Sequence, residues 1–156
     1  MLTSRRDYLL RIIDEVGRML ARVIFHRQGD RPQDALQAVV QACERLFSME
    51  ADKLFQFTPE QHFEMLTEGE RTETARNKVL LYAALNAEAG RIYQQMTNPT
   101  MALGSFQNAL RFTLQAEESF PREHWPEFAP NVENLLSLVQ SAPLDEEIRT
   151  LLKNRG

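Results

Sequence analysis

Hydrophobic residues recur every three or four positions along almost the whole chain, which is the spacing of one face of an α-helix. Between Ser4 and His26 they form one long stripe, made of Leu9, Ile12, Ile13, Val16, Leu20, Val23 and Ile24. No segment alternates apolar and polar residues convincingly or gathers β-branched residues, as strands do. The pattern therefore predicts an all-α protein built from antiparallel helix pairs.

Capping and turn residues divide this pattern into about six to seven helices. A capping box at Ser4 and Asp7 opens the first helix, and Gly29 is expected to take a left-handed conformation at its end. Proline opens later helices, at Thr58-Pro59 and Asn98-Pro99 for example. The expected helices span residues 4–26, 32–47, 59–68, 72–95, 99–118, 131–140 and 144–153.

The remaining features of the pattern concern packing. Helix 32–47 has a wide apolar arc, which predicts that it packs between two neighbours. The short break at residues 96–98 predicts that the two helices around it lie antiparallel. The connection at 48–57 has room for one helical turn, and the segment 120–130 combines prolines with Phe120, Trp125 and Phe128. We expect that segment to be an irregular connector packed on the core.

A set of small and aromatic residues marks the segment from residue 83 to 116. Its members are Ala89, Gly90, Tyr93, Ala102, Phe106 and Ala109. In type and spacing this set resembles the tetratricopeptide repeat, a helix-turn-helix unit of about 34 residues. The resemblance implies that Gly90 permits close approach of two helices. It also implies that the helix pairs stack into a short right-handed superhelix with a concave face. The length of the chain predicts one domain over residues 1–156.

An earlier segment repeats part of this signature 67 residues before it, with the same spacing of Ala35, Val39 and Ala42. Its first helix matches less well, because Gly17 stands farther from the following alanine than Gly90 does. Asn86 also replaces the usual aromatic residue of the full repeat. The alternative interpretation is an ordinary helical bundle. The N-terminal DYLLRIIDEVGRMLARVI is similar to small uncharacterised bacterial helical proteins.

Composition and motifs exclude several classes of function. A net charge of -4 argues against binding nucleic acid, which requires concentrated positive charge. The one cysteine, Cys43, lies on an apolar stripe and is expected to be an inert buried thiol. The three histidines lack metal-site spacing, and no phosphate-binding or hydrolase motif occurs, so we expect no metal, no cofactor and no enzymatic activity. No signal peptide or membrane span is apparent, and the expected location is the cytoplasm.

The resemblance implies that function lies in a groove lined by the first helix of each pair. In the second pair, the side chains turned away from the helix contact are Asn86, Arg91, Gln94 and Gln95. Arg91 is the preferred candidate, because a guanidinium can bind a peptide carboxylate bidentately. The alternatives for Arg91 are a solvated side chain or an ion pair with Glu88. Arg18 and Arg22 in the first helix would add positive charge to the groove, or lie on a solvated face.

Two hypotheses of function remain open at this point. The first is a non-enzymatic helical-repeat module that binds a protein or peptide partner, or itself as a homodimer, because short repeat arrays leave apolar ends exposed unless they are capped. The second is a helical bundle with a small-molecule pocket, either a sensor or an unfamiliar enzyme, which the aromatic residues of the connector suggest. An open concave surface favours the first hypothesis, and a closed apolar cavity favours the second.

Overall fold

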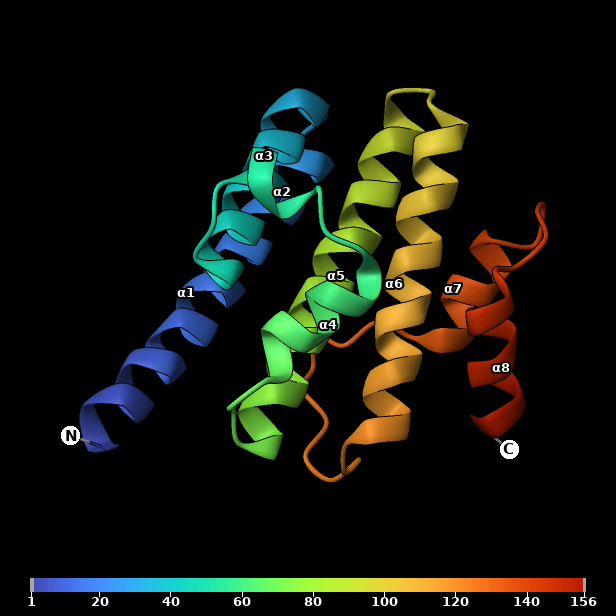
Figure 1. Ribbon diagram of the computed structural model, residues 1–156. Coiled ribbons are helices and arrows are strands. Elements are labelled where there is room, and N and C mark those ends of the chain that lie inside the picture. Colours follow the sequence, from blue (N-terminus) through green and yellow to red (C-terminus); the bar gives the residue numbers. More distant parts are fainter. Residues whose placement is uncertain (1, 156) are drawn as a thin grey trace.

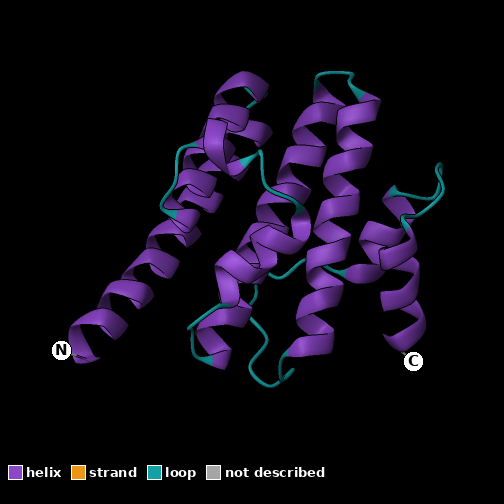
Figure 2. Cartoon of the chain, viewed as in Figure 1, coloured by secondary structure: helices purple, strands orange, loops and turns teal. Residues whose placement is uncertain are grey.

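The structure of the protein, a computed structural model, describes the backbone of residues 2–155 and the side chains of residues 5–155. Within residues 2–155 the chain forms eight α-helices and no strand, which confirms the predicted all-α fold (Figures 1 and 2). The helices are α1 (Leu2–Gln28), α2 (Pro32–Phe47), α3 (Ala51–Leu54), α4 (Pro59–Thr67), α5 (Thr72–Gln95), α6 (Pro99–Ser119), α7 (Val132–Leu138) and α8 (Glu146–Arg155). The helix beyond the expected seven is the single turn α3, in the connection that had room for one.

Two helical hairpins, α1 with α2 and α5 with α6, form the body of the molecule (Figure 1). α2 packs against both α1 and α5, as its wide apolar arc predicted, and α4 lies against α5. The last two helices, α7 and α8, pack against α6, where they form a second apolar cluster beside the main core. None of the helices in the described part of the chain is long and apolar enough to cross a membrane.

The helix starts predicted from proline, threonine and asparagine are confirmed. Pro32, Pro59 and Pro99 are each the first residue of a helix. The hydroxyl oxygen of Thr58 accepts a hydrogen bond from the Gln61 N–H at 3.2 Å, and the Thr58 N–H donates to the Gln61 side chain at 2.8 Å. These contacts satisfy N–H groups that have no partner inside the helix.

Both ends of α1 differ from the prediction. The helix begins at Leu2, so Ser4 lies within it instead of capping it, and the Ser4 side chain lies outside the described residues. At the other end Asp30, with φ 58°, takes the left-handed conformation expected of Gly29. The Arg31 N–H donates to the His26 carbonyl at 3.0 Å, which closes a Schellman motif. The left-handed position lies one residue farther along the chain than expected, and aspartate tolerates this region better than most residues.

α5 ends on the same motif, with Thr97 at φ 54° and the Asn98 N–H bonded to the Tyr93 carbonyl at 2.9 Å. A β-branched residue is costly in this region of backbone space, whereas glycine enters it freely. We expect Thr97→Gly to raise the free energy of unfolding by about 1 kcal/mol, measured by urea denaturation. Asp30→Gly is the comparison, and its free energy of unfolding should rise less, because aspartate tolerates the left-handed conformation better than threonine. A loss of stability in Thr97→Gly would contradict this account.

Gly90 allows the close helix contact that its place in the signature predicted. A Cβ atom added at Gly90 would lie 2.4, 2.5 and 2.8 Å from three ring carbons of Phe106, which is buried in α6. The first hairpin has no equivalent contact, because a Cβ atom added at Gly17 would meet nothing within 4 Å. The two hairpins therefore share the buried small residues of their second helices, such as Ala35 and Ala102, but not this packing detail.

The connector between α6 and α7 packs against the main core through Phe120, Trp125 and Phe128, as expected. Arg76 of α5 fixes its path: the guanidinium donates to three carbonyl oxygens of residues 121, 123 and 124 at 2.8 to 3.2 Å and lies 5.6 Å from the centre of the Trp125 ring. The aromatic residues of the connector thus pack against the core and against Arg76. α7 is shorter than expected, and α8 is shifted two residues toward the C-terminus.

Candidate functional site

The N-terminal turns of α1 extend beyond the end of α2, and an open groove lies between them and the start of α5. α1 has 27 residues and α2 only 16, so the first part of α1 has no α2 beside it. Figure 1 shows these turns diverging from α5 at the lower left of the molecule. The groove has a volume of about 470 Å³ and is completed by the turn between α4 and α5.

The floor of the groove is apolar and comes from α1. Leu9, Leu10 and Ile13 line it, and Leu10 is 45% exposed. Tyr8 is 48% exposed as well, but it does not line the groove, since it lies about 200° around α1 from Leu10. Leu10 together with the partly buried Leu9 and Ile13 forms an accessible apolar patch, and such a patch indicates a contact surface. None of the side chains described between residues 5 and 11 of α1 is buried, and Ile12 is the first that is.

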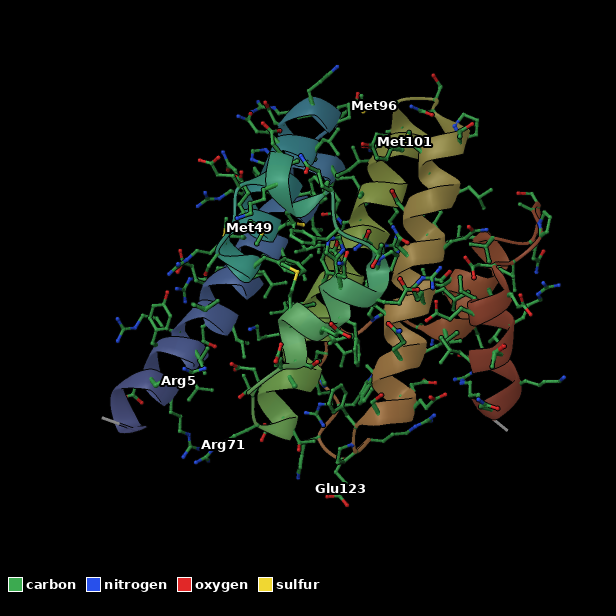
Figure 3. The ribbon with its side chains drawn as sticks, viewed as in Figure 1. Arg5, Met49, Arg71, Met96, Met101 and Glu123 are labelled. Atoms are coloured by element: carbon green, nitrogen blue, oxygen red, sulfur yellow. The ribbon has the colours of Figure 1, made fainter. Side chains whose placement is uncertain are left out.

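The rim of the groove carries three arginines and three carboxylates: Arg5, Arg6, Asp14, Glu70, Arg71 and Glu73. Within the described residues only one pair of these is in contact, between Arg5 and Glu70 at 3.3 Å. The side chains of Arg6, Asp14, Arg71 and Glu73 are exposed. Figure 3 shows Arg5 and Arg71 on the two sides of the opening, one on α1 and one directly before α5. The rim is therefore strongly charged but has no excess of either sign.

Glu70 is the buried polar group of the site. Gly69, at φ 75°, turns the chain before it, a conformation that glycine adopts without strain. The Glu70 side chain is only 6% exposed. Its Oε1 accepts from Arg5, but its buried Oε2 has no hydrogen-bond partner among the described residues. Burial lowers the pKa of nearby Lys78, and the negative charge of Glu70 partly offsets this decrease. A buried carboxylate oxygen without a donor is costly, so this atom is suited to a donor from a bound molecule.

The six side chains predicted as binding residues lie outside this groove. Asn86 donates to the Tyr82 carbonyl at 2.9 Å, and Gln94 is exposed. Arg18 stands nine residues after Leu9, and Arg22 nine after Ile13. Because nine residues make about two and a half helical turns, these two arginines lie on the side of α1 opposite the groove floor. That the six form a binding surface of their own stays a prediction.

Arg91 and Gln95 belong instead to a polar contact between α5 and the end of α1. Glu88, with a side chain 6% exposed, accepts from Arg91 at 3.2 Å and from two nitrogens of Arg27 at 3.1 Å. Gln95 donates to the Arg27 carbonyl at 2.8 Å. The pairing of Arg91 with Glu88 is one of the two alternatives that the sequence left open. Arg27, through Glu88 and Gln95, joins the two hairpins at the end of the molecule remote from the groove.

Sequence reasoning missed a second polar cluster around the buried Arg111 of α6. Its guanidinium donates to Asp145 at 2.9 Å and to Glu147, and Glu60 lies 4.0 Å away. A hydrogen bond from the Glu147 N–H, supported by Arg111, lowers the pKa of Asp145. Burial and the nearby Glu60 raise the pKa of Glu147. The cluster joins α8 to α6, and Asp145 also caps α8 by accepting from the Glu147 N–H at 2.9 Å.

The other chemically reactive side chains occupy structural positions. Cys43 is buried, and burial raises the pKa of its thiol to about 12, which fits the inert thiol expected from the sequence. His62 is buried, with Nε2 2.8 Å from the Leu54 carbonyl and Nδ1 3.2 Å from the Tyr82 hydroxyl. Across residues 5–155, no group of three histidine, cysteine or acidic side chains has the geometry to hold a metal ion.

The signal for the groove was present in the sequence but was not distinctive. Tyr8, Leu9 and Leu10 are three consecutive apolar residues, more than one helical face can bury. Comparison of the chain with protein families, with curated proteins and with solved structures gives no match. The site is therefore interpreted from its own geometry.

Proposed function

We propose that this protein is a non-enzymatic helical module that binds another polypeptide chain in the groove between α1 and α5. The observation that carries the proposal is the groove itself: an apolar floor with Leu10 exposed, a charged rim, and a buried carboxylate oxygen of Glu70 that lacks a donor. Polypeptides supply apolar side chains together with N–H donors, so one binding partner satisfies all three features.

The arrangement of the helices supports a repeat-like scaffold within this proposal. The hairpins α1–α2 and α5–α6 stand next to each other, and the matched small residues Ala42 and Ala109 of their second helices are both fully buried. α1 and α5 are the first helices of these pairs and form the two walls of the groove. In stacked helix pairs, the first helices line the surface that binds partners. We accordingly extend the tetratricopeptide resemblance to both hairpins. The first hairpin differs from the repeat at Gly17, which makes no close helix contact like that of Gly90.

Site-specific photocrosslinking tests the proposed function. A benzophenone amino acid replaces Leu10 in the groove or, as a matched control, Phe25, which is on the same helix, apolar and 71% exposed but absent from the groove lining. In the cells that produce the protein, irradiation should join the Leu10 variant, and not the Phe25 variant, to a polypeptide. Leu9→Asp should abolish that product, because it places a charge on the groove floor. Equal yields at both positions, or no polypeptide product at Leu10, would refute the proposal.

A further inference from the structure

We propose that the polypeptide bound in this groove is a second copy of the same chain, arranged about a two-fold axis so that each copy contributes its α1–α5 groove. This inference rests on the proposed function and names its partner. In a two-fold contact the same patch is used on both copies, so the patch must be complementary to itself. Three features of the groove meet this requirement: the charges of its rim, the apolar residues of its floor and the buried carboxylate of Glu70.

The rim charges meet the requirement. Arg6 and Arg71 are exposed and without an ion pair in the described chain, and so are Asp14 and Glu73. The free charges on this patch are thus two of each sign. A uniformly acidic or uniformly basic partner would meet like charges at half of these positions, which disfavours its binding. A second copy presents the same balanced set, and a two-fold axis can place arginines of one copy opposite carboxylates of the other.

The apolar residues and Glu70 supply the rest of the contact. Leu10, which is 45% exposed, lies in the groove lining on a part of α1 that extends beyond α2. Packing two such grooves against each other would remove Leu10 and the partly buried Leu9 and Ile13 from water, which drives association. The unpartnered Oε2 of Glu70 requires an N–H donor. The exposed guanidinium of Arg6 from the second copy provides donors of the charge-assisted kind that carboxylates bind best.

Sedimentation analysis of charge-reversed variants tests this arrangement. Arg6→Glu/Arg71→Glu makes the four free rim charges negative, and Asp14→Lys/Glu73→Lys makes them positive. We expect the wild-type mass to rise with concentration to that of a dimer. Each variant alone should dimerise at least about tenfold more weakly, because like charges then face each other. An equimolar mixture of the two variants should form a heterodimer, since opposite patches meet at every position.

The control is Lys53→Glu/Lys153→Glu, which changes the net charge as much as the first variant does but at exposed residues of α3 and α8. It should dimerise like the wild type. Leu10→Asn is a second variant that should weaken dimerisation without changing any charge of the rim. Circular dichroism verifies that every variant is helical. A wild-type protein that is monomeric at all concentrations, a control that weakens dimerisation equally, or a mixture that stays monomeric would overturn self-association.

The two proposals fail in different ways. If Leu10 crosslinks to a different polypeptide while the wild type is strictly monomeric, the binding groove stands and self-association is wrong. If Leu10 crosslinks to no polypeptide, both are wrong. A crosslinked product with twice the mass of the chain, together with a heterodimer from the mixed variants, supports both.

Discussion

Gly90→Ala is expected to lower the free energy of unfolding by about 2 kcal/mol, although alanine is the better helix former. The added methyl group would come within 2.4 Å of the Phe106 ring. That ring is 1% exposed and enclosed by α6, α7 and α8 residues, so it has little room to move away. The α5–α6 hairpin must therefore open slightly or Phe106 must leave its preferred rotamer, and either change weakens the packing between these helices.

Gly104→Ala is the matched control, because Gly104 lies inside α6 but an added Cβ atom would have nothing within 4 Å. This substitution should raise stability by about 0.5–1 kcal/mol through the lower backbone entropy of the unfolded chain. Phe106→Leu should cost less in the Gly90→Ala background than in the wild type, since the two residues are in contact. Urea denaturation measures the free energy of unfolding of the wild type, the three single variants and the double variant. A stabilising effect of Gly90→Ala similar to that of Gly104→Ala would show that the two helices are not in close contact here.

The second large effect is expected at the contact between α1 and α5. Arg27→Met removes the bidentate partner of Glu88 and leaves a buried carboxylate held by Arg91 alone. Removing one member of a buried ion pair typically costs about 3 kcal/mol or more, because the remaining charge stays desolvated. We expect a loss of about 3 kcal/mol in the free energy of unfolding, measured by thermal and urea denaturation.

A pair elsewhere on α1 provides the comparison. Glu15 of α1 and Arg45 of α2 lie 3.0 Å apart, but their side chains are 40% and 35% exposed. Arg45→Met should therefore cost less than about 1 kcal/mol. The double substitution Arg27→Met/Glu88→Leu should recover part of the stability lost in Arg27→Met, since no buried charge is left without its main partner. Equal losses for Arg27→Met and Arg45→Met would mean that Glu88 is not desolvated.

The sequence was sufficient for the features of the fold that depend on local chemistry. Thr58, Asn98 and the prolines after them fix helix starts through hydrogen bonds a few residues long, and α5 has the bounds expected from its apolar spacing. Gly90 was identified by its place in a packing signature. The end of α1 was misassigned, because the choice between Gly29 and Asp30 for the left-handed position depends on how far the helix continues.

The binding groove was harder to predict because it arises from the relative position of two helices. Leu9 fits the buried stripe of α1, and only the shorter length of α2 leaves it at a groove instead of in the core. Glu70 looks like an ordinary loop carboxylate until Gly69 turns it inward. Arg27 and Arg111 are similar cases, since their partners are distant in the sequence and come from other helices. The repeat signature in the sequence predicts how helices pack. The positions of the buried charged groups are set by contacts between distant helices, which the signature does not contain.

Hydrogen–deuterium exchange at two protein concentrations tests the proposed binding surface most directly. Amides in residues 5–14 of α1 and 70–77 around the start of α5 should exchange more slowly in a concentrated sample than in a dilute one, because a second copy covers the groove and suppresses opening of these turns. Amides of α7 and α8 should exchange equally in both samples and serve as the internal reference. Unchanged exchange at the groove, or concentration-dependent protection confined to another surface such as that around Phe25, would contradict the account.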